Sequence, residues 1–276
     1  MRGNEPRTIF SLRTIPARAF VEKAKSMSGH SKWATIRRKK AVTDGKRGKM
    51  FTQVIKEITI AAKLGGGDPT GNPRLRFAID KAKSSNMPAD NIKRAIQKGT
   101  GELPGMAYED VTYEAYGPGG VALLIEAVTD NKTRTVSEIR HVLDRHHGKL
   151  AASGAVAYQF HRKGQITILR NKIGEDELLG IILDAGAEDM TADEEHYLVT
   201  TLPDVFEKVK KVIEDRKIPI DHSEIQMIPE NSVKVEGKDA ENLIKIIEGL
   251  EDHDDIQHVY GNFDIDESVL ANLNAG

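Results

Sequence analysis

Four consecutive cations, Arg37 to Lys40, are the residues of this sequence that most directly suggest a chemistry. Lysine and arginine side chains neutralise phosphate groups, so a dense basic run predicts binding to nucleic acid. Residues 27–103 carry 17 Lys/Arg against 6 Asp/Glu, whereas residues 104–276 carry 17 against 34. Because the positive charge is gathered in one segment, we favour a polyanion partner over an ordinary solvated surface.

The candidate nucleic-acid-binding residues share positive charge or lie beside the basic runs. They are His30, Lys32, Trp33, Arg37, Arg38, Lys39, Lys40, Lys46, Arg47, Lys49, Arg74, Arg76, Lys81, Lys83, Lys93 and Arg94. Trp33 either anchors a helical core or stacks on a base. Possible functional loops contain Gly117, Pro118, Gly119 and Gly120 in one case, and Asn131 and Arg134 in the other. A tight turn between two strands explains the first loop equally well.

No set of residues converges on a reaction. His146 and His147 are adjacent, so they face different sides of a helix and cannot chelate one metal at i,i+4 spacing. The sequence lacks cysteine, and it lacks the His-Glu-x-x-His and Gly-x-Ser-x-Gly motifs. The run Asp252-His253-Asp254-Asp255 could hold a divalent cation weakly, but we favour a solvated loop. We therefore predict a protein that is not an enzyme and has no cofactor, metal or small-molecule substrate.

Helices must position the cations of the basic segment. Apolar spacing predicts helices from Ser31 through the basic run, from about Lys49 to Leu64, after Pro73, and from Pro88 to Lys98-Gly99. In the third helix the expected buried stripe is Leu75, Ala78, Ile79 and Ala82. Helices this short need mutual packing, so the segment is predicted to be a helical bundle.

The pattern of residues 104–276, the acidic part of the chain, predicts both strands and helices. Strands are expected at Val111–Tyr116, Val121–Thr129, Ala155–Phe160 and Gln165–Leu169, with a helix capped at Asp130-Asn131. From residue 164 the order β-α-β-β-α-β predicts a ferredoxin-like arrangement. We therefore expect a multi-domain α and α+β fold. Its parts are an N-terminal extension outside the fold (1–26), a basic helical domain (27–103), a split α+β domain (104–163 and 230–276) and an inserted ferredoxin-like α+β domain (164–229).

Residues 1–26 contain four arginines, Arg2, Arg7, Arg13 and Arg18, and few acids. They indicate either a translation start at Met27 or a mitochondrial-type transit peptide. We favour the start at Met27, and hence a cytoplasmic protein. A transit peptide would make it mitochondrial. No apolar run approaches the roughly 20 residues of a membrane helix, so no membrane partner is expected.

Several motifs resemble those of the YebC/PmpR family. They are Met27-Ser-Gly-His-Ser-Lys-Trp-Ala-Thr-Ile-Arg-Arg-Lys-Lys-Ala41, Asp44-Gly-Lys-Arg-Gly-Lys-Met-Phe51, Gly66-Gly-Asp-Pro69, Asn72-Pro-Arg-Leu-Arg76, Asn86-Met-Pro-Ala-Asp-Asn-Ile92, Tyr116-Gly-Pro-Gly-Gly-Val121 and Thr129-Asp-Asn-Lys-Thr-Arg-Thr135. The resemblance spans Met27 to about Ile265. It departs where the family has Gly-Gly, Leu-Gly and Gly-Ser, because this chain has His147-Gly148, Leu150-Ala151 and Gly154-Ala155.

This resemblance implies a helical head and two α+β domains, one inserted in the other, without catalytic residues. It also implies a cytoplasmic, DNA-binding regulator of transcription. Mitochondrial relatives are translational activators, and relatives act on ribosomes stalled at proline-rich stretches. A ribosome-associated translation factor that binds ribosomal or transfer RNA is therefore the alternative. In both cases the partner is nucleic acid, and we expect a monomer or a weak dimer.

Overall fold

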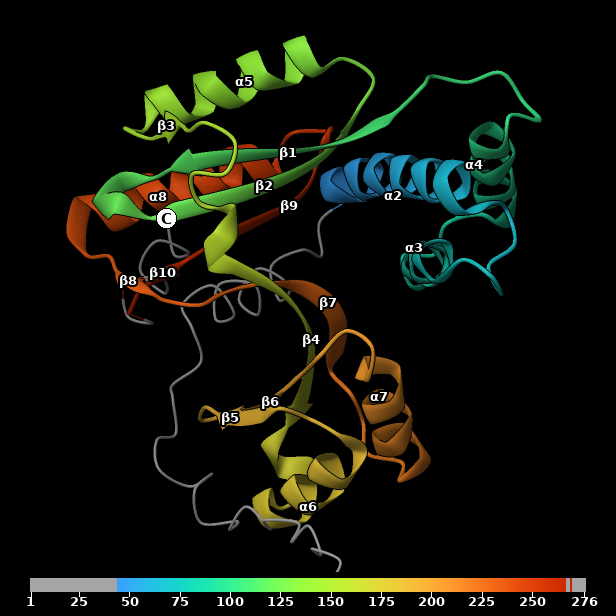
Figure 1. Cartoon of the computed structure of the whole chain (residues 1–276), viewed down its shortest axis with the longest axis vertical. Helices are drawn as coiled ribbons and strands as arrows, with labels where there is room; N and C mark the ends of the chain where they lie inside the picture. The colour runs from blue at the N-terminus through green and yellow to red at the C-terminus, as the bar shows by residue number, and fades with distance from the viewer. Residues whose placement is uncertain (1–43, 267–268, 270–276) are drawn as a thin grey trace, which may run out of the picture.

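The computed structural model describes residues 44–266 and residue 269, with side chains from residue 48 onward (Figure 1). The helix predicted from Ser31 through the basic run lies outside these residues. The described chain is a multi-domain α and α+β structure with separate hydrophobic clusters. None of its helices is long and apolar enough to cross a membrane.

The helical region contains α2 (Asp44–Gly65), α3 (Pro73–Ser84) and α4 (Ala89–Thr100). All four residues of the predicted α3 stripe are buried, because they repeat at helical spacing toward α2. The prediction that α4 ends at Lys98-Gly99 is wrong. Gly99 is a packing residue, since a Cβ there would lie 2.7 Å from the Ala62 Cβ. The helix ends one residue later, at a left-handed cap on Gly101.

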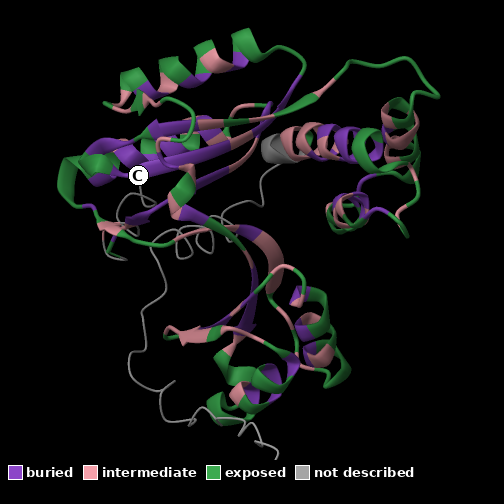
Figure 2. Ribbon diagram, viewed as in Figure 1, coloured by how far each residue is buried: buried purple, intermediate pink, exposed green. Residues whose placement is uncertain are grey.

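A four-stranded antiparallel sheet with the order β3-β1-β2-β9 follows. Its members are β1 (Glu109–Tyr116), β2 (Ala122–Thr129), β3 (Lys149–Leu150) and β9 (Ile256–Gly261). Helices α5 (Lys132–Arg145) and α8 (Gly237–Glu251) pack on one face, and a short turn, η2 (Pro118–Gly120), joins β1 to β2. Two further short strands, β8 (Val233–Lys234) and β10 (Phe263–Asp264), pair in parallel. Figure 2 shows buried residues concentrated along these strands and the facing side of α8.

The second sheet has the order β5-β6-β4-β7 and the chain order β-α-β-β-α-β that the sequence predicted. Its strands are β4 (Phe160–Leu169), β5 (Asp189–Ala192), β6 (His196–Thr201) and β7 (His222–Pro229). Two helices, α6 (Glu175–Ala185) and α7 (Phe206–Asp215), pack on it, and a short turn, η4 (Arg170–Lys172), precedes α6. The core of this region includes Ile166, Val199 and Phe206.

Strand β4 connects the two sheets without a break. The strand predicted at Ala155–Phe160 is wrong, because Ala157–Gln159 forms a 3-10 turn, η3. The strand predicted at Gln165–Leu169 is confirmed, and it begins earlier than expected, at Phe160. The antiparallel partner β7 returns beside it, from the Phe160–Pro229 pair to the Thr167–His222 pair. A two-stranded ribbon therefore links the two sheet regions (Figure 1).

Candidate nucleic-acid interface

Helix α2 packs against other parts of the molecule on two sides. One face buries Val54, Ile58 and Ala61 against α3 and α4. The other carries Lys49, Gln53 and Lys56, which follow each other at intervals of four and three residues and so share one side of the helix. These three side chains contact the turn that precedes β9: Lys49 pairs with Asp252 at 3.3 Å, and the Gln53 amide donates to the Ile256 carbonyl at 2.7 Å.

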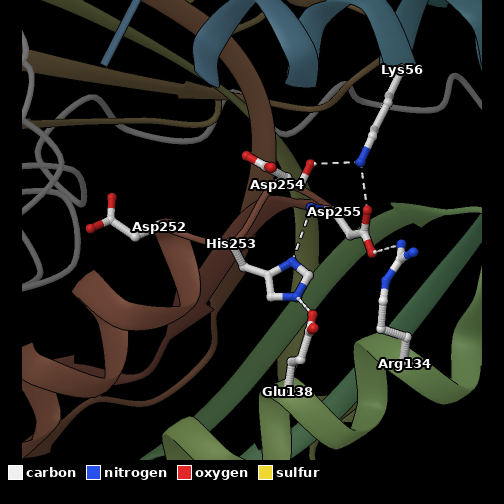
Figure 3. A pocket seen from close by; sticks show the side chains of 7 residues that line it. All are labelled: Lys56, Arg134, Glu138, Asp252, His253, Asp254 and Asp255. Atoms are coloured by element: carbon white, nitrogen blue, oxygen red, sulfur yellow. Dashed lines mark hydrogen bonds and ion pairs between the residues drawn. The ribbon is translucent and has the colours of Figure 1, made fainter. Parts of the chain in front are cut away.

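Lys56 and Asp255 form the centre of this contact (Figure 3). The Lys56 Nζ lies 2.5 Å from Asp255 Oδ1 and donates to the Asp254 carbonyl at 3.0 Å. Both side chains are nearly buried, at 10% and 3% exposure. Burial opposes ionisation of Asp255, but hydrogen bonds from Lys56, Thr135 and Arg134 outweigh it and hold the pKa of Asp255 well below its ordinary value.

The other carboxylate oxygen of Asp255 organises the loop between β2 and α5. It accepts hydrogen bonds from Thr129 Oγ1 at 3.0 Å, Thr135 Oγ1 at 2.7 Å and Arg134 Nη2 at 3.0 Å. Asn131 caps α5 by accepting from the Arg134 amide. The predicted loop residues Asn131 and Arg134 therefore have structural partners, and Arg134 connects the loop to the helical region through Asp255.

The turn at residues 252–255 lines a pocket of about 460 Å³ together with Lys56, Arg134 and Glu138 (Figure 3). The His253 Nδ1 accepts from the Asp255 amide, so the proton lies on Nε2, which faces Glu138 Oε2 at 2.5 Å. Two carboxylates of this run, Asp252 and Asp255, are engaged by α2 lysines. Within the described residues no group of His, Asp and Glu could hold a metal ion. The turn is a docking surface for α2, so the solvated loop favoured from sequence is wrong at Asp255, which is buried and paired with Lys56.

Arg74 also forms ion pairs within the molecule. Its guanidinium contacts Glu57 through Nε at 2.7 Å and Asp110 through Nη1 at 2.6 Å. The hydrogen bonds that Arg74 donates to Asp110 and Glu57 raise the pKa of Arg74 above its ordinary value in spite of partial burial. Arg74 therefore joins α2, α3 and the start of β1, which is a structural role.

Other predicted cations of the helical region remain exposed. Lys81, Lys93 and Arg94 are exposed and have no ion-pair or hydrogen-bond partner among the described residues. Lys98, which the sequence analysis did not include, shares this property. Lys83 lies 3.9 Å from Asp80 on the surface, a weak pair. Arg76 contacts the Pro69 carbonyl at 3.4 Å and lies over the Phe77 ring.

Several predicted residues lie beyond what the structure describes. These are His30, Lys32, Trp33, Arg37, Arg38, Lys39 and Lys40. Lys46 and Arg47 belong to α2, but their side chains are not described.

The two predicted functional loops do not meet. Residues 117–120 precede β2 and residues 129–135 follow it, so they lie at opposite ends of one strand (Figure 1). Gly119 and Gly120 have φ of 71° and 78°, which favours glycine, and a Cβ on Gly117 would lie 2.9 Å from Leu243. The first loop is accordingly a tight turn packed on α8.

Sequence reasoning missed Lys56 and Asp255 as a pair. They are 199 residues apart, and no local pattern connects them. The helical spacing of Lys49, Gln53 and Lys56 indicates that one side of α2 is polar, but a polar side is equally typical of a helix that faces solvent.

The described fold and its charged contacts define a multi-domain protein in which a helical region docks on an α+β body. Residues 31–102 match the family model described as the TACO1/YebC protein N-terminal domain, and residues 108–263 match the model described as the TACO1/YebC second and third domain. The chain belongs to the TACO1/YebC family.

Similar proteins carry regulatory names. A protein of Pelodictyon phaeoclathratiforme named "Probable transcriptional regulatory protein" is 54% identical over 250 residues, which is 90% of this chain and 100% of that protein. One of Chlorobaculum tepidum with the same description is 55% identical, over 90% of this chain and 99% of that protein. The crystal structure of a conserved hypothetical protein from Aquifex aeolicus is 46% identical, with a TM-score of 0.74, and covers 82% of this chain and 94% of that one. These names support a regulatory role.

Proposed function

We propose that this chain is a DNA-binding transcriptional regulator whose helical region holds the phosphate backbone through the cations of α3 and α4. The observation that carries the proposal is that Lys93, Arg94 and Lys98 are exposed on α4 without partners in the described part of the chain. Lys49 and Arg74 are instead paired inside the molecule. The cations on α3 and α4 are therefore the ones available to a ligand.

The names of the relatives favour DNA as the target, because they refer to transcription. Exposed lysine and arginine contact phosphates and fix position, whereas base edges carry the sequence information. We therefore expect an affinity that falls steeply with salt and depends weakly on sequence. The basic run at residues 37–40, with Lys46 and Arg47, belongs to the same proposal by its charge. We place the protein in the cytoplasm, as a monomer or a weak dimer that is not an enzyme.

The test compares two triple variants by fluorescence anisotropy on a labelled 20-base-pair duplex over a range of salt. In the first, Lys93, Arg94 and Lys98 become Gln. In the matched control, the exposed body residues Lys208, Lys211 and Lys238 become Gln, which removes the same charge. Each lost phosphate contact lowers the slope of log affinity against log salt by about 0.9, so the first variant should lose about 2 to 3 in slope. Equal behaviour of the two variants would refute the proposal.

Ultraviolet crosslinking in cells then separates DNA from RNA as the target. Reads concentrated on promoter regions support the transcriptional proposal. Reads concentrated on ribosomal or transfer RNA would overturn it in favour of the translation factor considered from sequence.

A further inference from the structure

Two tyrosines are exposed at the end of the first sheet that lies away from the helical region. Tyr158 is 70% exposed on η3, and Tyr116 is 40% exposed at the end of β1. The Tyr116 hydroxyl donates to the Ala155 carbonyl at 3.2 Å, which brings η3 and β1 together. We propose that Tyr116, Lys149 and Tyr158, here called the tyrosine platform, bind single-stranded nucleic acid, with a base stacked on Tyr158 and a phosphate at Lys149. This inference rests on the proposed function.

A buried carboxylate holds the loop that presents Tyr158. Glu114, 6% exposed, accepts hydrogen bonds from the amides of Gly154, Val156 and Ala157 at 2.6, 2.6 and 2.9 Å. Burial raises the pKa of Glu114, but these amide hydrogen bonds outweigh it and the pKa lies below its ordinary value. Val156 is fully buried beneath the loop. The Tyr158 backbone is therefore fixed before any ligand arrives, which lowers the entropy lost on binding.

Lys149 lies beside Tyr116 on the same face of the sheet. It is the cross-strand partner of Tyr116 in the β1–β3 ladder, and directly opposite residues share a face with Cβ atoms roughly 5 Å apart. Lys149 is exposed and has no ion-pair partner among the residues described. At this end of the sheet burial, and then the nearby charges of Arg145, Lys245 and His147, lower the pKa of His146.

This combination of groups fits a single strand better than a duplex. Aromatic rings stack on unpaired bases of any sequence, and neighbouring cations hold the backbone between them. A duplex keeps its bases stacked on each other and offers Tyr158 no free face. Residues 104–276 carry 34 Asp/Glu against 17 Lys/Arg and so repel phosphate on average, and Lys149 supplies a cation at the platform.

The platform is separated from the cations of the helical region. The β1 and β3 residues of the platform lie at the start of β2, and the α2 docking turn lies at its other end. Eight strand residues span about 25 Å. A ligand with a duplex part and a single-stranded part could thus contact both sites, which suggests the probe for the test.

The experiment compares a blunt 20-base-pair duplex with the same duplex extended by ten unpaired nucleotides at each 3′ end. We expect wild-type protein to bind the extended probe about ten-fold more tightly, which corresponds to one stacked base. Tyr158→Ala should remove this gain and leave blunt-duplex binding unchanged, while Tyr158→Phe keeps the ring and the gain. Lys149→Gln should reduce the gain, and Lys172→Gln serves as its charge-matched control. An unchanged melting temperature shows that these surface variants fold.

The outcomes are distinct for the two proposals. Equal binding of the two probes by wild-type protein, or a gain that persists in Tyr158→Ala, overturns the platform. Loss of the gain in Tyr158→Phe as well would mean that the hydroxyl, not stacking, is responsible, and overturns the stacking role. Blunt-duplex binding that is insensitive to the α4 triple variant instead refutes the proposed function.

Discussion

The Lys56 Nζ of the helical region lies 2.5 Å from Asp255 Oδ1 of the body, and both side chains are nearly excluded from solvent. Interfaces between domains of one chain are usually polar and permit motion. A buried pair differs, because separating it would expose two charges and take Lys56 away from both of its acceptors, Asp255 Oδ1 and the Asp254 carbonyl. The pair therefore fixes how the helical region is oriented on the body.

Replacing Asp255 by Ala should lower the free energy of unfolding by roughly 3–5 kcal/mol, because Lys56 would stay buried without its carboxylate. Lys56→Met should cost less, since its apolar side chain fits the same space. Chemical denaturation of the two single variants and the double variant gives the coupling energy. Additive effects in that cycle would show that the two residues do not interact.

His258 predicts a pH dependence of stability. Burial, and then the charge of Lys81, lower the pKa of His258 to about 4, from an ordinary value near 6.5. The unfolded chain therefore takes up a proton below about pH 6.5, which the folded chain refuses until about pH 4. Stability is full above this window and falls through it by on the order of 3 kcal/mol. His258→Gln should flatten urea-unfolding data between pH 6.5 and 4, whereas an unaltered profile would assign the effect elsewhere.

His147 predicts a stabilising substitution. Its φ is 62°, in the left-handed region, directly after the cap of α5. A non-glycine residue is disfavoured there, because its Cβ crowds the backbone in the left-handed region. His147→Gly should raise stability by about 1 kcal/mol, measured by thermal unfolding. His147→Ala is the control and should give no gain, since alanine keeps the Cβ penalty.

Two helix glycines should respond in opposite ways to alanine. A Cβ on Gly99 would collide with Ala62 and the Thr59 carbonyl, so Gly99→Ala should force α2 and α4 apart and cost roughly 1–3 kcal/mol. Gly180 in α6 has no neighbour within 4 Å of such a Cβ. Gly180→Ala should therefore stabilise by up to about 1 kcal/mol through helix propensity alone. Similar melting temperatures for the two variants would contradict the close packing of α2 on α4.

Glu114 holds the loop that carries Tyr158, so a change at Glu114 should affect ligand binding at the tyrosine platform. Glu114→Gln offers one neutral carbonyl oxygen in place of two charged ones, so it should loosen η3. We expect faster hydrogen exchange at Gly154, Val156 and Ala157 and a smaller gain on the extended probe. Unchanged exchange at those amides would show that the loop is held by packing of Val156 instead.

The sequence was most informative where structure follows from local periodicity. The α3 stripe and the cap of α5 at Asn131 were predicted because neighbours along a helix determine them. The segment at Ala155–Phe160 was misread, since its apolar residues suit a strand and its turn depends on Glu114, some 40 positions earlier. The pairing of Lys56 with Asp255 could not be predicted for the same reason, because the two residues are 199 positions apart in the sequence. The excess of positive charge identified the basic segment from the sequence. Only the structure shows which of its cations form ion pairs within the molecule.

The ribbon of β4 and β7 also bears on how this architecture could arise. The chain leaves the first sheet region and returns to it through two cross-strand partners, Phe160 and Pro229. Everything between them could be replaced by a short hairpin without moving either end, since adjacent strands lie roughly 5 Å apart. The second sheet region is therefore a module that evolution can gain, exchange or lose in one genetic step, while the docking of α2 on Asp255 is preserved.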